Sequence, residues 1–106
     1  AAHCAKTLRP GANLPEPKAA AIEPLLDRFD AIRHASGSRP TASLRDEMQR
    51  AMQRDAAVFR TGETLAAGCA ALGRCREGFR DLRITDRSLV FNTDLVEALE
   101  LDNLLG

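Results

Sequence analysis

One segment of the sequence, Leu44 to Gly68, restricts the fold more than any other part of the chain. Its apolar residues recur at spacings of three and four, which indicates an amphipathic helix with one buried face. Thr61 and Gly62 interrupt this pattern. Thr61 suits a helix cap, and Glu63 places a negative charge in the first turn that follows. The segment therefore predicts two consecutive helices joined by a tight break.

The first of these helices is expected to begin at Thr41 or Ser43, where Ser43 and Asp46 resemble a weak capping box. Asp46 and Arg50 lie one turn apart and suit an ion pair. The residues expected on its buried face are Leu44, Met48, Ala51, Met52, Ala56, Val58 and Phe59. The residues expected on its wet face are Arg45, Gln49, Arg50, Gln53 and Arg54.

Residues 18–36 and 63–82 have the same helical periodicity. In the first of them, regular helix is expected from about Glu23, because Pro24 fits best at a first helical position. In the second, the small residues Gly68, Ala70, Ala71 and Gly73 would allow a neighbouring helix to approach closely. The stripe expected to be buried there is Leu65, Cys69, Leu72, the stem of Arg76, Phe79 and Leu82.

A last helix is predicted from Asp94 to at least Leu105, capped by Asn92 or Thr93. The apolar run Leu89–Phe91 before it suits an extended segment. Apolar residues cover more than one face of this helix, so we expect it to be buried on several sides. The candidates for burial against another domain are Leu95, Leu99, Leu101, Leu104 and Leu105.

Composition agrees with an all-α fold. Aromatic residues make up 4% of the chain, with neither Trp nor Tyr, whereas strands favour aromatic and β-branched residues. We predict one antiparallel bundle of three long helices with short helices at its ends, in a spectrin-like three-helix arrangement. Residues 18–106 form this bundle domain, and residues 1–17 are the end of a preceding helix and a Pro-rich linker. Both ends of the sequence lie in helical or apolar patterns, so we expect a truncated piece of a longer polypeptide.

No constellation of side chains suits catalysis, cofactor binding or metal binding. The two histidines, His3 and His34, have no partner at a metal-ligand spacing. The cysteines are odd in number and are expected to be reduced core thiols in an intracellular protein. They are Cys4, Cys69 and Cys75. None of the serines Ser36, Ser38, Ser43 and Ser88 lies in a nucleophile-elbow context. We therefore predict no catalytic, cofactor-binding or metal-ligating residue.

Charge argues against a nucleic-acid or membrane partner, because the formal net charge is +0. Arg45, Arg50, Arg54 and Arg60 line a basic edge without interleaved aromatics, which favours an ion-paired or interface surface over nucleic-acid binding. The acidic residues Glu97, Glu100 and Asp102 are likewise expected to be solvated or paired with Arg. No apolar run is long enough to span a bilayer, and no signal peptide is recognisable, so we predict no direct membrane insertion.

Two blocks of the sequence resemble the flavoprotein subunit of the succinate dehydrogenase/fumarate reductase family. The first is the run Leu-Arg-x-x-Met-Gln-x-x-Met-Gln-x-x-Ala-Ala-Val-Phe-Arg-Thr-Gly over residues 44–62. The second is the run from Asp86 to Leu105, which includes Phe-Asn-Thr-Asp-Leu-Val-Glu and Leu-Asp-Asn-Leu-Leu. Residues 1–10 also resemble the helix that closes that family's flavin-binding domain. The resemblance identifies the chain as the family's helical domain.

For the intact subunit, the resemblance implies oxidation of succinate to fumarate, with electrons passing through FAD to an iron–sulfur subunit. It places the flavin-binding and substrate-binding residues upstream of Ala1, so that the fragment itself is inactive and binds no FAD. Its role would be structural, packing on the flavin domain of the same subunit and helping to shape the dock for the iron–sulfur subunit. Arg60 would have a structural or interface role at a helix end. The resemblance further implies a cytoplasmic subunit held peripherally at the inner membrane by its partner subunits.

Alternatives remain open at this stage. The intact protein could instead be a fumarate reductase or an L-aspartate oxidase flavoprotein, although the Met-Gln-x-x-Met-Gln run favours succinate dehydrogenase. A hypothesis from another functional class is that the chain is a stand-alone helical module that binds a partner helix. Apolar surface exposed on the isolated piece would also allow it to dimerise by helix pairing.

Overall fold

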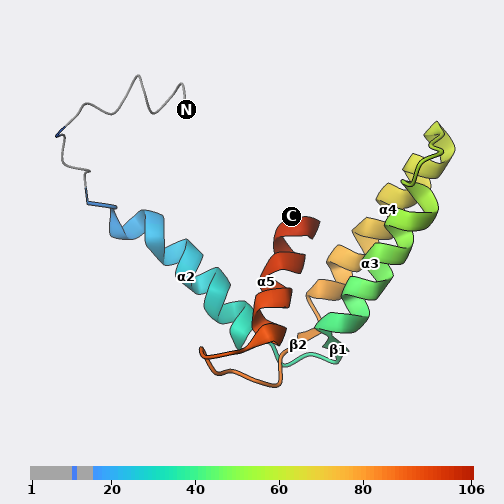
Figure 1. Cartoon of the computed structure of the whole chain (residues 1–106). Helices are drawn as coiled ribbons and strands as arrows, with labels where there is room; N and C mark the ends of the chain where they lie inside the picture. The colour runs from blue at the N-terminus through green and yellow to red at the C-terminus, as the bar shows by residue number, and fades with distance from the viewer. Residues whose placement is uncertain (1–10, 12–15) are drawn as a thin grey trace.

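The computed structural model of the chain describes residue 11 and residues 16–106. The elements run in the order α2 (Ala19–Arg33), β1 (Arg39–Pro40), α3 (Thr41–Asp55), α4 (Gly62–Phe79), β2 (Leu82–Arg83) and α5 (Thr93–Leu105) (Figure 1). Helices dominate the described residues and the two strands are two residues long, so the predicted all-α class is confirmed. The helix end expected over residues 1–8, and most of the loop after it, lie outside the described residues.

α3 and α4 form a tight antiparallel hairpin (Figure 1). Leu44, Met48 and Ala51 are buried on α3, as the sequence predicts. The buried residues of α4 are the small ones, Gly68, Ala71 and Cys75. A Cβ atom at Gly68 would lie 3.0 Å from the Cβ of Asp55, so the missing side chain allows the close approach. The prediction that small residues admit a neighbour is confirmed at Gly68 and Ala71 but not at Gly73, which faces open space.

The hydrophobic core lies where α5 crosses the base of this hairpin. Leu95, Ala98 and Leu101 of α5 are buried, and they join a cluster that also contains residues from α2, α3, α4 and the strands. The remaining members of this cluster are Ile32, Leu44, Met48, Cys75, Leu82 and Ile84. α5 is therefore the third helix packed with α3 and α4, and the spectrin-like bundle expected from residues 18–36, 41–59 and 63–82 is not confirmed.

α2 leans on α5 and diverges from it toward the N-terminal side (Figure 1). Among its residues only Ile32 is buried, at the end nearest the core. The helix begins at Ala19 and contains Pro24, whereas the sequence predicts regular helix from about Glu23. Pro24 is tolerated because the carbonyl that loses its donor, that of Ala20, lies on an exposed turn where water can hydrate it.

A short parallel pairing joins the two ends of the α3–α4 hairpin. Arg39 pairs with Leu82, and Pro40 pairs with Arg83. The pairing is extended by backbone hydrogen bonds from Gly37 N to Leu82 O, at 2.8 Å, and from Ile84 N to Ala35 O, at 3.0 Å. A Cβ atom at Gly37 would overlap the carbonyl of Asp81, so only glycine fits there. The sequence predicts irregular loops in both places, because nothing local signals a pairing over this separation.

The start of α3 at Thr41 is one of the two predicted starts, whereas its cap and its C-terminal end differ from the prediction. The helix starts at Thr41 after Pro40 and has no side-chain cap, so the capping box proposed at Ser43 is absent. It ends at Asp55, and residues 56–59 form bends instead of continuing the helix. Val58 and Phe59 are consequently 87% and 92% exposed, which corrects their assignment to the buried stripe, and Met52 is also exposed.

The break between the helices has the chemistry that the sequence predicts. Thr61 caps α4 and accepts a hydrogen bond from Thr64 N, while Thr64 Oγ1 accepts one from Thr61 N. Glu63 lies in the first turn. Along α4, however, Leu65 and Cys69 are exposed where burial was expected, because the small residues of the helix face α3. α4 also ends at Phe79, and the buried Leu82 belongs to β2.

Candidate functional site

The described residues contain no cluster of three or more His, Cys, Asp or Glu side chains that would hold a metal ion. Nδ1 of the His34 ring lies 2.9 Å from the backbone oxygen of Asp30. Cys75 is buried, and burial raises the pKa of its thiol, which keeps it protonated and unreactive. The expectation of core thiols is therefore confirmed for Cys75 and wrong for the exposed Cys69. His3 and Cys4 lie outside the described residues.

The acidic residues of α5 are paired with arginines of other helices. The sequence left open whether they are solvated or paired with Arg, and the second alternative is confirmed. Arg45 Nη2 lies 2.7 Å from Glu100 Oε2, and Arg45 Nε lies 3.8 Å from Glu97 Oε2. Arg28 of α2 binds Asp102 at 2.5 Å. These pairs attach α5 to α3 on one side and to α2 on the other, so the carboxylates hold the helices together.

The arginines of the α3 edge are also engaged within the chain. Arg50 pairs with Asp46 at 2.9 Å, and Arg54 binds both oxygens of Asp55, at 2.8 and 2.6 Å. The hydrogen bonds from Arg54 lower the pKa of the Asp55 carboxyl, which therefore stays ionised beside Gly68. The expectation of an ion-paired surface at these positions is confirmed.

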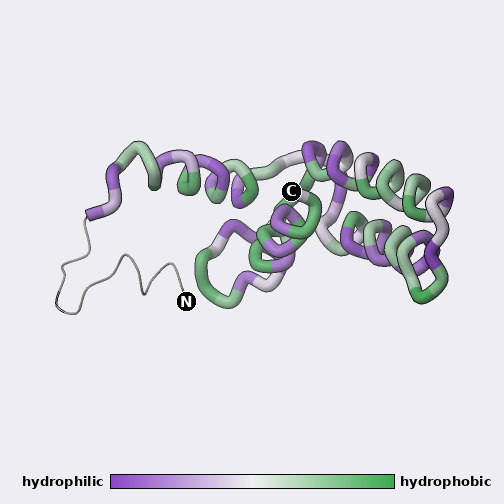
Figure 2. Tube along the Cα trace, turned by 90° about the horizontal axis from the view of Figure 1, so that it is seen from above, coloured by the Kyte–Doolittle hydropathy of each residue, from purple (hydrophilic) through white to green (hydrophobic). Residues whose placement is uncertain are grey.

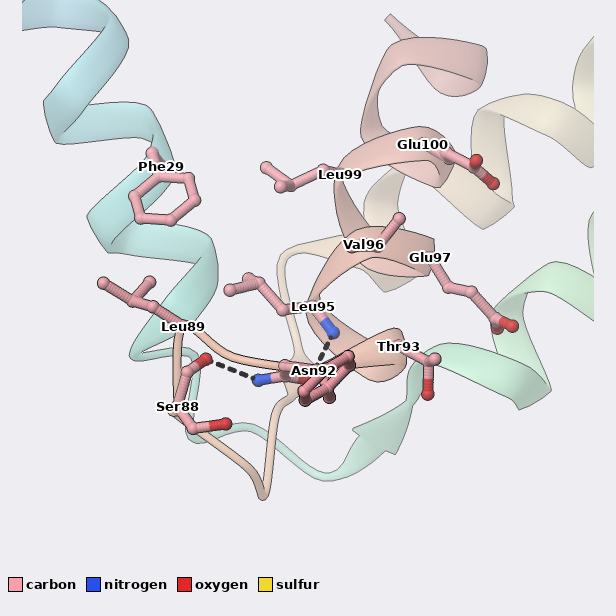
Figure 3. A pocket seen from close by; sticks show the side chains of 11 residues that line it. Phe29, Ser88, Leu89, Asn92, Thr93, Leu95, Val96, Glu97, Leu99 and Glu100 are labelled. Atoms are coloured by element: carbon pink, nitrogen blue, oxygen red, sulfur yellow. Dashed lines mark hydrogen bonds between the residues drawn. The ribbon is translucent and has the colours of Figure 1, made fainter.

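An apolar groove with a volume of about 540 Å³ lies between α2 and α5. Figure 3 shows Phe29 of α2 facing Leu95 and Leu99 of α5, with Leu89 beside it. The groove exists because α2 diverges from α5 and leaves this face of α5 without a covering helix. The full lining is Phe29, Ser88, Leu89, Phe91, Asn92, Thr93, Leu95, Val96, Glu97, Leu99 and Glu100.

A loop with several internal hydrogen bonds forms one wall of this groove. Asn92, which is buried, donates from Nδ2 to the backbone oxygens of Asp86 and Ser88, at 2.6 and 3.0 Å, and accepts from Leu95 N at 2.9 Å (Figure 3). The carboxylate of Asp86 accepts from Ser88 N at 2.8 Å, and this bond lowers the pKa of Asp86. The predicted cap at Asn92 is confirmed, whereas the extended segment expected at Leu89–Phe91 is a bend.

Phe91 occupies an unusual position in this loop. Its φ angle is 53°, in the left-handed region that costs a non-glycine residue of order 1–3 kcal/mol, and its side chain is 99% exposed. Sequence reasoning missed Phe91 as a functional candidate, because neither backbone strain nor exposure is visible in an apolar run. The surrounding hydrogen bonds hold the strained conformation and present the ring to the outside.

Further exposed apolar side chains lie on α2, on α5 and in the loop that precedes α5, where Figure 2 shows a hydrophobic stretch. Several large exposed apolar side chains around an apolar groove are typical of a surface that another polypeptide covers. The more strongly exposed members are Leu25, Leu26, Leu89, Val90, Phe91, Val96 and Leu104.

The leucines expected to be buried against another domain divide into two groups. Leu95 and Leu101 are 4% and 0% exposed within this chain's own core, so they are not available to a neighbour and that expectation is wrong for them. Leu99 and Leu105 pack partly against the core, and Leu104 is 63% exposed. Around the groove, the apolar surface available to a neighbour is therefore carried mainly by α2 and by the loop before α5.

The groove lining has no cationic side chain for a diphosphate such as that of FAD, which binds to cationic side chains or to converging backbone N–H groups. The charged side chains of the lining are Glu97 and Glu100, and both are paired with Arg45. None of the helices described over residues 16–106 has both the length and the apolar character needed to cross a membrane.

Comparison with protein families matches residues 45–106 to the family described as the fumarate reductase flavoprotein C-terminus. The succinate dehydrogenase flavoprotein subunit of Rickettsia felis is 52% identical over 83% of this chain and 15% of its own length. The mitochondrial succinate dehydrogenase [ubiquinone] flavoprotein subunit of Oryza sativa subsp. japonica is 46% identical over 95% of this chain and 16% of its own length.

A fumarate reductase flavoprotein subunit is also similar. The one from Escherichia coli is 37% identical over 86% of this chain and 15% of its own length. The chain thus spans less than a fifth of the length of the relatives that it matches. The similarity includes the α3–α4 hairpin and α5, where no catalytic constellation was found among the described residues.

Proposed function

This chain belongs to the family of fumarate reductase and succinate dehydrogenase flavoprotein subunits, and we propose that it is the helical region of a succinate dehydrogenase flavoprotein subunit. The observation that carries this proposal is identity of 52% and 46%, over most of the chain, to subunits with that name. The lower identity to the Escherichia coli fumarate reductase, 37%, favours succinate oxidation over fumarate reduction.

In the intact enzyme, this subunit would oxidise succinate to fumarate and pass the electrons through FAD to an iron–sulfur subunit. We place FAD and the substrate outside residues 16–106, because the groove lining contains no Lys or Arg to hold a diphosphate and the acidic side chains of α5 are engaged by arginines. The isolated chain is accordingly expected to be inactive and free of flavin.

The role proposed for this chain is to pack on the flavin domain of the same subunit through the groove and its apolar surroundings. Phe91 would be the anchor of that contact, since it is 99% exposed on a loop that is already fixed by hydrogen bonds. Anchoring through an ordered loop avoids the entropy cost of ordering that loop on binding. Full burial of a Phe side chain stabilises by about 1.5–3 kcal/mol, so this single contact is a substantial part of such an interface.

The remaining partners follow from the same assignment. This chain would also help to shape the dock for the iron–sulfur subunit, and other subunits would hold the complex at the cytoplasmic face of the inner membrane. In isolation, the uncovered surface of α2 would favour pairing of two copies, since Leu25 and Leu26 are 64% and 57% exposed. A concentration-dependent mass in solution would show such a dimer.

Hydrogen exchange tests the proposed packing. The complete flavoprotein subunit and the isolated chain are compared, and we expect the amides of residues 22–29 and 88–91 to exchange at least tenfold more slowly in the complete subunit. The exposed face of α3 around Gln49 and Gln53 serves as the internal reference. Equal exchange of residues 88–91 in both proteins would refute the packing.

Two further measurements on the same samples test the assignment of function. The assembled enzyme should oxidise succinate with an artificial electron acceptor faster than it reduces fumarate with a low-potential donor. The isolated chain should show no flavin absorption and no flavin mass. A flavin bound to the isolated chain would overturn the placement of the cofactor outside these residues.

A further inference from the structure

α2 is attached to the rest of the described structure mainly through its C-terminal end. Residues 19–28 are all exposed, Phe29 is half-buried, and Ile32 is the one buried residue of the helix. α3, by contrast, has buried residues from Thr41 to Asp55. Figure 1 shows α2 diverging from α5 toward its N-terminal end. Tertiary packing supplies most of the stability of a helix in a protein, and for α2 that packing is confined to the last two turns.

The polar contacts that hold α2 on α5, and on the loop before it, lie at the surface. Arg28 Nε donates to Asp102 Oδ2 at 2.5 Å, and its Nη2 donates to Asn103 Oδ1 at 3.1 Å. Arg33 Nε donates to the backbone oxygen of Arg87 at 2.7 Å. Exposed ion pairs contribute little to stability, because water competes for both partners. These contacts therefore select the docked position of α2 without holding it firmly.

An undocked α2 has little to keep it helical. It is 15 residues long, its start has no side-chain cap, and Pro24 within it removes one backbone donor. Isolated helices shorter than about 12–15 residues are marginal in water even for favourable sequences. Undocking of α2 should therefore lead to its unfolding.

This unfolding has a fixed limit in the backbone. Ala35 O accepts from Ile84 N at 3.0 Å, and Gly37 N donates to Leu82 O at 2.8 Å, so the chain after α2 is tied to the core. Ile32 is the one buried side chain that the core cluster loses when α2 leaves. The contacts among α3, α4 and α5 do not pass through α2 and can remain in place.

We propose that α2 is a conditionally folded helix, which unfolds and redocks on its own while α3, α4, α5 and the paired strands stay folded. The groove is affected directly, because Phe29 of α2 faces Leu95 and Leu99 across it (Figure 3). It is complete only in the fraction of molecules in which α2 is docked. A body that fills the groove gains contact with Phe29 and shifts the population toward docked α2, and its apparent affinity is reduced by the docked fraction. This equilibrium belongs to the chain itself and holds whichever body packs on the groove.

Hydrogen exchange on the chain of residues 1–106, followed for single amides by NMR, tests this equilibrium. After correction for intrinsic rates, the amides of residues 25–33 should exchange about tenfold or more faster than those of residues 48–51 and 98–101. Low concentrations of urea should accelerate exchange less at residues 25–33, because opening of α2 alone exposes less surface than global unfolding.

Two alanine variants at neighbouring positions separate docking from helix propensity. Arg28→Ala removes both hydrogen bonds to α5, and exchange at residues 25–33 should become about two- to fivefold faster, as expected for the loss of an exposed ion pair. Asp27 is exposed and belongs to none of the ion pairs of the described residues. Asp27→Ala should leave this exchange unchanged or slow it, because alanine is the better helix former. Exchange at residues 48–51 should keep its parent value in both variants.

Two results would overturn the proposal. Equal exchange at residues 25–33 and in the core helices, whether slow or fast, would mean that α2 opens only together with the whole chain. Unchanged exchange in Arg28→Ala would mean that docking on α5 does not control the folding of α2. Both results leave the proposed packing on the flavin domain intact, because that packing is judged by residues 88–91 in the complete subunit.

Discussion

At the scale of single residues, glycine decides which parts of the backbone touch. Gly37 lies against the backbone of Asp81, and its backbone N–H bonds Leu82 O, so a side chain there would push the two strands apart. Gly73 lies within α4 and faces open space, so nothing in the fold requires it. The sequence shows both as glycines and does not reveal this difference, because the atoms that Gly37 meets lie more than forty residues away.

The substitutions Gly37→Ala and Gly73→Ala are therefore expected to act in opposite directions. Gly37→Ala should lower the free energy of unfolding by roughly 2 kcal/mol or more, because a backbone contact must open. Gly73→Ala should raise it by about 0.5–1 kcal/mol, because alanine is the better residue within a helix. Urea unfolding of the two variants beside the parent chain measures both. A loss of stability in Gly73→Ala would contradict the open surroundings described for that site.

At the scale of the elements, the caps at two helix starts could be predicted from local signals, whereas the packing between distant segments could not. Thr61 and Asn92 cap their helices as predicted, because a cap depends only on residues within one turn. The exposure of Val58 and Phe59 was not predicted, since their spacing alone continues the helical pattern past Asp55. Helix existence was therefore predictable from the sequence, but helix ends and partners were not.

The two candidate caps of the hairpin provide a direct comparison. Thr61→Ala removes a side-chain oxygen that accepts from Thr64 N, and we expect it to destabilise by about 0.5–2 kcal/mol. Ser43→Ala lies inside α3 and removes no cap bond, so its unfolding free energy should stay within about 0.5 kcal/mol of the parent value. Thermal unfolding followed by circular dichroism ranks the two. Equal losses would indicate that α3 begins at Ser43 after all.

At the scale of the whole molecule, the all-α class and the family could be predicted from the sequence, whereas the arrangement of the helices and the apolar surfaces could not. The two sequence blocks pointed to the family, and the comparisons agree with them. The groove depends on the divergence of α2 from α5, and the exposure of Phe91 depends on a strained turn. Neither is encoded in periodicity, because both arise from how separate helices are placed.

Acid should destabilise the whole chain through three aspartates with lowered pKa values. Asp55 is held by Arg54, Asp81 by the hydroxyl and backbone N–H of Ser38, and Asp86 by the backbone N–H of Ser88. A carboxyl whose pKa is lower in the folded chain binds fewer protons there than in the unfolded chain. Its stabilising effect is therefore present above the ordinary value of 3.8 and is lost as the pH falls through the lower folded value.

Unfolding measured from pH 6 down to pH 2 should accordingly show stability falling below about pH 4. Asp81→Asn is expected to be less stable at neutral pH and to lose less on acidification, because one of the titrating carboxyls is gone. If the free energy of unfolding of this variant fell as steeply with acidification as that of the parent chain, Asp81 would not contribute to the loss.

The pairing of Arg39 and Pro40 with Leu82 and Arg83 also has a consequence for how the domain can vary. The chain enters the α3–α4 hairpin and leaves it at these two paired strands, so the hairpin is joined to the rest of the domain at one place. Lengthening both of its helices by one turn would move the far end outward by about 5.4 Å. The paired strands, α2 and α5 would keep their places. The length of the α3–α4 hairpin can therefore change without a change in the core that it extends from.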